Sequence, residues 1–350
     1  MHKTHIDPAL RAGASQPTGW FCFGLAGDLR AGQVKTVRYF DQDYVMFRTR
    51  SGAIRVAHGV CPHMGGLLTR GAVVRGEWLQ CPNHQFCFDE QGRCTATPQG
   101  VRPPDVHIHY LPVRLYAGAI MVYLHPTPTE TPWAFQGWVE GEAGWSSWQY
   151  FRQGYDVYPI ILAEDLVDMW HVLTAHRFHN AEQILPFEAD GPIARASYRA
   201  ERTEPLLGTI TSEVTVQISG VGFITTQVDV PVMGLSMRYL VLPRPIGIKR
   251  CDVMFAFQMN CDLLQSTHRR YLRLLPKRLT NTLAQQAMVL AYWLDNRRDQ
   301  RNWERELLLS SRPGTRASAL FAYRKWASQF HPGLSLRPAP HGRTEAVAVS

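Results

Sequence analysis

The sequence lacks any long apolar run: no stretch approaches the ~20 residues that a membrane-spanning helix needs. Its first residues, from Met1 to Asp7, show no apolar segment of the secretory type, so we expect a cytoplasmic protein. Only seven of the 350 residues are cysteine, too few for a disulfide framework in a chain of this length. Because the cytosol keeps cysteines reduced, a cluster of cysteine and histidine residues would indicate a metal site.

Nucleic-acid motifs are also absent, although the net charge is +8 and the pI is near 9.2. Lysine and arginine are spread along the chain, and their densest group lies between Lys277 and Arg305 on a predicted helix. A solvated helix face is the simplest interpretation of this group. The alternative is a docking face for an acidic electron-donor protein, since basic surfaces steer acidic partners. We expect no nucleic-acid partner and no membrane association.

The chain is long enough for two hydrophobic cores, and its composition changes at a proline-rich stretch. Before that stretch, segments rich in β-branched and aromatic residues alternate with turns that contain Gly or Asp. These predicted strands cover 34–40, 44–48, 53–57, 78–80 and 120–124. We therefore predict a small all-β domain over 1–125, with its core at 19–125. Residues 126–133 contain three prolines and are predicted to be a linker.

The second part, residues 134–330, mixes helices and strands. Helical periodicity covers 163–174, 280–309 and 317–330, and strands are predicted at 197–200, 209–218, 221–230, 236–242 and 253–259. This pattern predicts an antiparallel sheet with helices packed on it, so the whole chain is expected to be an α+β protein. The tail, 331–350, is rich in Pro, Gly and Arg and is predicted to be disordered.

Two short motifs each pair one cysteine with one histidine: Cys61-Pro-His63 and Cys81-Pro-Asn-His84, with 17 residues between them. Most iron–sulfur clusters use four thiolates, and histidines in place of two of them on one iron give a Rieske centre. The spacing C-x-H-x17-C-x2-H is that of the Rieske motif. We therefore predict a [2Fe–2S] cluster held by these two cysteines and two histidines.

The alternative is a structural zinc site. Zinc sites more often pair cysteine with cysteine and histidine with histidine, so the mixed pairs favour the cluster. Gly65 and Gly66 would let backbone N–H groups approach the cluster. Gly66 and Asn83 stand where respiratory Rieske proteins carry a disulfide brace, so the site resembles the lower-potential clusters of oxygenases and ferredoxins. The other cysteines are interpreted as small buried hydrophobic residues: Cys22, Cys87, Cys94, Cys251 and Cys261.

A third motif places Asp168, His171 and His176 at the spacing D-x2-H-x4-H. Asp168 and His171 are three residues apart and share a helix face. His176 lies about 140° from His171 around an ideal helix of ~3.6 residues per turn. The two histidines can therefore bind one ion only if the helix ends or bends near Thr174. His179, three residues beyond His176, is a further candidate.

Together, these motifs resemble the oxygenase component of Rieske non-haem iron oxygenases, closest to the 3-ketosteroid 9α-hydroxylase branch. The resemblance spans 19–330 and is carried by 61–66, 166–171 and 324–330. It implies an N-terminal Rieske domain followed by a catalytic domain of helix-grip type. Asp165 departs from the pattern, because relatives often carry Asn there. Residues 178–241, expected to line the substrate pocket, show no match.

The resemblance also implies ligands for a mononuclear Fe(II). His171 and His176 would bind the ion together with one carboxylate from the C-terminal part of the chain. Asp299, four residues before Trp303, fits the family pattern for this ligand. Asp295, one turn earlier on the same helix, is the rival.

The family further implies a homotrimer in which electrons cross between subunits. His84 of one subunit would then hydrogen-bond Asp168 of the next, and Asp168 would touch His171. Asp168 is thus expected to be an electron bridge rather than a ligand, a role that also orients the histidine. An ordinary solvated carboxylate is the alternative for Asp168. Glu164, one turn earlier, is a second candidate for such a supporting role.

No dinucleotide fingerprint is present, because the glycines at 13, 19, 24 and 27 do not make G-x-G-x-x-G. Electrons from NAD(P)H would therefore arrive only through a separate reductase or ferredoxin. The predicted function is an O₂-dependent monooxygenase that hydroxylates an apolar, ring-containing substrate. Demethylation, dihydroxylation or desaturation by the same machinery stays open, as does a Rieske electron carrier with a non-catalytic ligand-binding domain.

Overall fold

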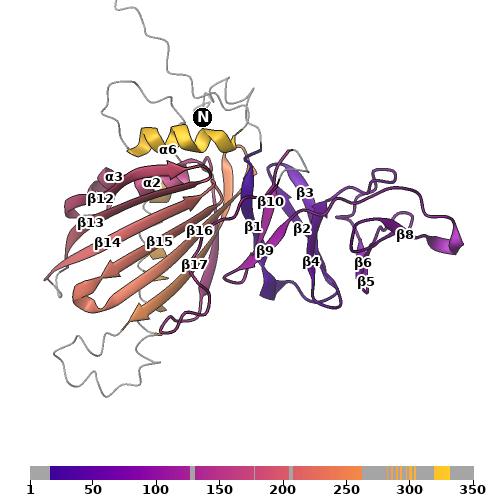
Figure 1. Ribbon diagram of the computed structural model, residues 1–350, viewed down its shortest axis with the longest axis horizontal. Coiled ribbons are helices and arrows are strands. Elements are labelled where there is room, and N and C mark those ends of the chain that lie inside the picture. The colour runs from indigo at the N-terminus through magenta and orange to yellow at the C-terminus, as the bar shows by residue number, and fades with distance from the viewer. Residues whose placement is uncertain are drawn as a thin grey trace, which may run out of the picture.

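The computed structural model describes residues 16–126, 131–176, 178–204, 208–261 and 319–331, together with single residues and short runs between 282 and 304. Its N-terminal strands form three small antiparallel sheets beside one large sheet (Figure 1). None of the described helices is long and apolar enough to cross a membrane. The part of the predicted disordered tail after His331 and half of the predicted linker, residues 127–130, lie outside the described residues.

The small sheets explain the frequent turns in the first part of the sequence. Their strand orders are β1-β10-β9, β2-β3-β4 and β5-β6-β7-β8, and all neighbouring strands are antiparallel. The strands are β1 (Gly19–Leu25), β2 (Val34–Tyr39), β3 (Gln42–Arg48), β4 (Ile54–His58), β5 (Val73–Arg75), β6 (Trp78–Gln80), β7 (Cys87–Phe88), β8 (Cys94–Ala96), β9 (Val113–Tyr116) and β10 (Ala119–Leu124). Short 3-10 turns at Ala26–Asp28 and Pro98–Gly100 complete this part.

The second part is built on a seven-stranded antiparallel sheet with the order β11-β17-β16-β15-β14-β13-β12. Its strands are β11 (Gln149–Tyr155), β12 (His179–Asp190), β13 (Ile193–Glu204), β14 (Gly208–Ser219), β15 (Phe223–Val230), β16 (Leu235–Gly247) and β17 (Arg250–Cys261). Five of these were predicted from alternation, whereas both edge strands, β11 and β12, were missed. The predicted α+β class is confirmed.

The two faces of the large sheet are covered by different parts of the chain. On one face, the ring of Tyr292 packs on Tyr239, Phe255 and Phe257, with ring centroids 4.9–5.9 Å apart. On the other face, Leu240 and its neighbours pack in one cluster with residues of the N-terminal domain, such as Trp20 and Tyr116. Strand alternation sends successive side chains to opposite faces, so the middle of this sheet is covered on both sides, whereas β12 at its edge is largely exposed. The helices therefore lie on one face, and the N-terminal domain lies on the other.

The described helices are α2 (Ile161–Val167), α3 (Met169–Ala175) and α6 (Ala319–Ala327), with a 3-10 turn at Pro231–Met233 and another at Ser328–Phe330. Most of the described residues between 282 and 304 are also helical. The single helix predicted over 163–174 is wrong: the chain turns extended at Asp168, with φ −91° and ψ 98°. Asp168 therefore lies between two helices, and α3 runs in a new direction.

His331 ends the described part of the C-terminus and is buried with its Nε2 unpaired. Burial lowers the pKa of His331 to about 4, whereas an unfolded histidine titrates near ~6.5. As the pH falls from about 6.5 toward 4, only the unfolded chain gains this proton, so stability falls by up to about 1.4 kcal/mol per pH unit. We expect the loss of melting temperature between pH 7 and pH 5 to be smaller in His331→Phe than in the natural protein. Thermal melts of both proteins at pH 7 and pH 5 measure this loss, and an equal loss in the two proteins would contradict the prediction.

Candidate metal centres

The two Cys–His motifs form a matching pair of tight loops. In the first, the N–H of Cys61 donates to the carbonyl of Gly66, and the N–H of Gly65 donates back to the carbonyl of Cys61. In the second, Cys81 donates to Phe86, and Gln85 donates to Cys81. Both loops therefore reverse the chain over the same number of residues after the cysteine.

Each loop needs a left-handed residue four positions after its cysteine. This residue is Gly65 (φ 71°) in the first loop and Gln85 (φ 58°) in the second. Glycine adopts that conformation without strain, whereas a side chain such as that of Gln85 does so at a cost. The loops also meet directly, because a Cβ on Gly66 would lie 2.6 Å from Nδ2 of Asn83. The two positions where a disulfide brace would fall are thus adjacent, and a glycine there leaves room for Asn83.

The four predicted ligands converge where the loops meet. Cys61 and Cys81 are 3% and 1% exposed, respectively. The rings of His63 and His84 lie 4.9 Å apart in an edge-to-face arrangement. His63 Nδ1 is buried and has no hydrogen-bond partner. A buried nitrogen without a partner is costly unless something binds it, so the donor set fits a bound metal group.

The spacing of these donors argues against a single zinc ion. Ligand atoms on one tetrahedral zinc, at about 2.0–2.3 Å from the metal, lie within about 4 Å of one another. In the described part of the chain, the group of three or more possible ligands whose atoms all lie within 4.8 Å of one another is His171, His176 and Asp299. The Cys–His loops do not form such a compact group. A two-iron cluster separates its thiolate and imidazole ligands, which fits this wider arrangement.

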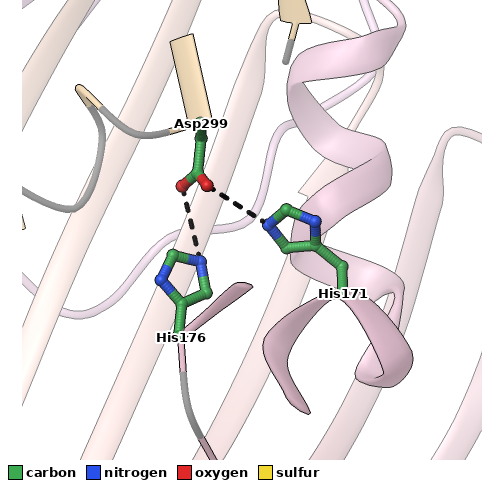
Figure 2. Close-up of side chains that lie close together, drawn as sticks. All are labelled: His171, His176 and Asp299. Carbon is green, nitrogen blue, oxygen red and sulfur yellow. Dashed lines mark ion pairs between the residues drawn. The ribbon is translucent and has the colours of Figure 1, made fainter. Parts of the chain in front are cut away.

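The compact group is the second centre, and it joins the α3 region to residues more than a hundred positions later in the sequence. His171 lies within α3, His176 directly follows it, and Asp299 comes from the helical residues near the C-terminus (Figure 2). In a continuous helix, His176 would point about 140° away from His171. Because α3 ends at Ala175, His176 is not held at that angle and can face the same point as His171. The two imidazole rings lie 5.2 Å apart.

The distances in this centre suit a shared ion better than direct hydrogen bonds. Asp299 Oδ1 lies 3.6 Å from His171 Nε2, and Asp299 Oδ2 lies 3.4 Å from His176 Nε2 (Figure 2). Two ligands at about 2.1 Å from one ion and roughly 90–110° apart are about 3.0–3.4 Å from each other. Both His171 Nε2 and Asp299 Oδ1 are buried without a hydrogen-bond partner. Two imidazoles and one carboxylate are the ligand set of mononuclear Fe(II) sites.

A second carboxylate, Asp165, stands beside this centre. Its Oδ2 lies 3.4 Å from His171 Nε2 and accepts a hydrogen bond from Trp303 Nε1. Burial raises the pKa of Asp165, although His171 and the Trp303 hydrogen bond act in the opposite direction. Burial by itself would lower the pKa of His171, but Asp299 and Asp165 outweigh it and raise this pKa. The sequence showed Asp165 only as a departure from the family pattern.

The structure places the other candidate residues as follows. Asp168 is half-buried and His84 is exposed. Glu164 is buried and forms a two-point ion pair with Arg324 of α6.

His179 begins β12 and lies 3.9 Å from Glu201, away from the compact group. Asp295, the rival of Asp299, lies outside the described residues.

Comparison with known proteins identifies the N-terminal part. Residues 19–114 match the family model described as the Rieske [2Fe–2S] domain. This part of the chain is a Rieske domain. The predicted [2Fe–2S] cofactor is thereby supported, and the Rieske domain contains both Cys–His loops.

The sequence relatives extend the likeness beyond the Rieske domain. The oxygenase component of 3-ketosteroid-9-alpha-monooxygenase from Rhodococcus rhodochrous is 31% identical over 185 residues, covering 49% of this chain and 46% of the relative. Cholesterol 7-desaturase nvd 1 from Ciona intestinalis is 36% identical over 118 residues, covering 33% and 25%. The matches thus span less than half the length of these curated relatives. They confirm the predicted relationship to Rieske oxygenase components.

Solved structures share the fold over nearly the whole chain. Dicamba monooxygenase bound to dicamba superposes with a TM-score of 0.62 at 16% identity, covering 91% of this chain and 98% of that one. NdmA from Pseudomonas putida CBB5 gives 0.62 at 16% identity, covering 92% and 90%. The fold of this chain, a Rieske domain followed by a sheet-rich domain, is therefore shared with dicamba monooxygenase and NdmA.

A cysteine substitution tests which thiols hold the Rieske cluster. Cys81→Ser should abolish the visible absorption of the purified protein, because a serine hydroxyl replaces a thiolate ligand. Cys87→Ser is the matched control, since Cys87 is also buried but lies in β7, directly after the second loop, and is not one of the proposed ligands. The control should keep its colour and sulfide content. A bleached Cys87 variant beside a coloured Cys81 variant would contradict the assignment.

Proposed function

We propose that this chain is the terminal oxygenase component of a Rieske monooxygenase system. The observation that carries the proposal is the presence of two unlike metal centres in one chain: the paired Cys–His loops and the compact set of His171, His176 and Asp299. When bound, a [2Fe–2S] cluster would supply single electrons and a ferrous ion would activate O₂ beside the substrate. The protein's part is to hold both groups, exclude water from them and position the substrate.

The proposed ligand roles are supported by this geometry. Cys61, Cys81, His63 and His84 would hold the cluster, with the exposed His84 at the surface of the domain. His171, His176 and Asp299 would hold Fe(II). Their side chains are between 7% and 19% exposed, which limits solvent access and strengthens electrostatic interactions at the site.

Electron transfer is proposed to cross between subunits of a homotrimer. His84 is exposed and Asp168 is half-buried at the junction of α2 and α3, so a second chain can reach both. Asp168 precedes His171 by three residues and would connect the neighbouring cluster to this ligand. Electrons would come from a separate reductase or ferredoxin. Arg297 and Arg301 are exposed and offer a basic dock for such a partner.

The proposed substrate is a largely apolar molecule with rings. Support comes from the relatives, which are named for a 3-ketosteroid and for cholesterol. Hydroxylation is favoured, with desaturation or demethylation open to the same machinery. The aromatic side chains of β16 and β17 already pack on Tyr292, so they are not assigned to substrate binding.

Metal analysis of the purified holoprotein tests the proposal. We expect about three irons and two acid-labile sulfides per chain, with a Rieske-type EPR signal on reduction. Two irons and two sulfides in protein supplied with Fe(II) would reduce the function to electron transfer. Zinc without sulfide would remove the proposal altogether.

A further inference from the structure

The second centre contains more negative charge than its three ligands provide. Asp165, on α2, brings a fourth ionisable side chain to within 3.4 Å of His171 Nε2. That distance equals the one between Asp299 and His176. The Asp165 side chain is 19% exposed, so water screens its charge only in part.

The Asp165 carboxylate is held in place from the helix that carries Asp299. Trp303, four residues after Asp299, donates its indole N–H to Asp165 Oδ2, the same oxygen that lies near His171. Trp303 is 6% exposed and packs edge-on against Tyr155, with ring centroids 5.5 Å apart. Residues four apart lie on one helix face, so Trp303 and Asp299 approach the centre together.

Asp165 nevertheless stands outside the compact ligand group. The atoms that lie within 4.8 Å of one another belong to His171, His176 and Asp299. Asp165 reaches only the His171 side of this group, and its near oxygen already accepts a hydrogen bond from Trp303. These two features indicate an influence through charge and orientation rather than direct ligation.

Counting charges shows what Asp165 would change. Two neutral imidazoles and one carboxylate leave a bound divalent ion with a net charge of +1. A second carboxylate balances that charge, and an unbalanced charge in a buried site is costly. We infer that Asp165 is a charge-balancing and positioning residue of the iron centre, which raises its affinity for a divalent cation. This inference rests on the proposed function, because it assumes that the compact group binds a metal ion.

Two substitutions separate the charge of Asp165 from its hydrogen bond. Asp165→Asn keeps an oxygen that can accept the Trp303 N–H but removes the negative charge. Trp303→Phe keeps the carboxylate and an aromatic ring but removes the donor. Glu304→Gln is the control. The Glu304 carboxylate follows Trp303 in the sequence, but its oxygen accepts a hydrogen bond from Gln300 at 2.7 Å rather than from Trp303.

The experiment is a titration of Mn(II) into the oxidised, cluster-loaded protein stripped of its mononuclear ion. Free Mn(II) gives an EPR signal that binding removes, and the oxidised cluster gives none. We expect Asp165→Asn to weaken Mn(II) binding by about tenfold, the lower end of the effect of groups that support metal ligands. Trp303→Phe should weaken it less than Asp165→Asn does, and Glu304→Gln should stay within about twofold of the natural protein. Melting temperatures and visible spectra of the metal-free variants report any loss of fold or cluster.

Each outcome decides one of the two claims. Unchanged Mn(II) affinity in Asp165→Asn, beside stoichiometric binding to the natural protein, would overturn the inference and leave the proposed function standing. A stronger effect of Trp303→Phe would also overturn it, because the hydrogen bond rather than the charge would then dominate. No binding of Mn(II) or Fe(II) to the natural protein would instead remove the proposed function.

Discussion

Asp299→Ala should reduce the iron content of the protein from three atoms per chain to two, while the two sulfides and the visible spectrum remain. Asp299 supplies an oxygen to each histidine of the compact group, at 3.6 and 3.4 Å. Without this carboxylate, the compact group would keep only two imidazoles for a ferrous ion, and oxygen ligands contribute strongly to such sites. The proposed oxygenase activity should fall by at least about a thousandfold, equivalent to about 4 kcal/mol of lost transition-state stabilisation.

The control for this prediction is Glu304→Ala, which removes a carboxylate five residues further along the chain. It should keep all three irons. Iron, sulfide and the EPR spectrum of the reduced cluster are measured on the same samples, so that cluster loss is not mistaken for loss of the mononuclear ion. Three irons in Asp299→Ala would show that another residue is the carboxylate ligand, and Asp295 would be the first to examine.

Glu164→Gln should destabilise the protein by about 3–5 kcal/mol, because it leaves Arg324 without its charged partner in a largely buried site. Arg324 Nε and Nη2 donate to the two oxygens of Glu164 at 2.6 Å each. This pair joins α6 to α2, where the hydroxyl of Tyr323 also donates to the carbonyl of Ile160. We expect the melting temperature to fall by roughly 4–7 °C.

The double variant Glu164→Leu/Arg324→Met tests the physical reason. Replacing both charges with apolar side chains should recover much of the lost stability, since no buried charge then stays unpaired. Arg199→Met is the matched control, because its pair with Glu213 is 44% and 39% exposed and should contribute less than about 1 kcal/mol. Equal losses in Glu164→Gln and Arg199→Met would contradict the argument. Because α2 also carries Asp165, the Glu164→Gln variant should in addition bind iron more weakly.

Strand β12 shows one way in which sequence patterns fail. β12 pairs with β13 through three register shifts, and each shift moves the following side chains to the other face. Its residues therefore do not alternate, and period-two alternation did not reveal it. β14, by contrast, pairs with β13 in continuous register, so its side chains alternate and the sequence predicted this strand. The break between α2 and α3 at Asp168 was also missed. The spacing of apolar residues stays helical on both sides of Asp168, so it does not reveal that the helix changes direction there.

The sequence by itself determined the Rieske site, because all four candidate ligands lie in two short loops whose spacing encodes their geometry. Cys61 and Cys81 each begin a loop closed by its own backbone hydrogen bonds, so local chemistry was sufficient. Only the tertiary structure brought Asp299 to His171 and His176, and only the tertiary structure placed Asp165 beside them and Glu164 against Arg324. These contacts join residues more than a hundred positions apart, or around a change of helix direction. Long-range packing of helices on the large sheet, rather than any local pattern, decides which of those side chains meet.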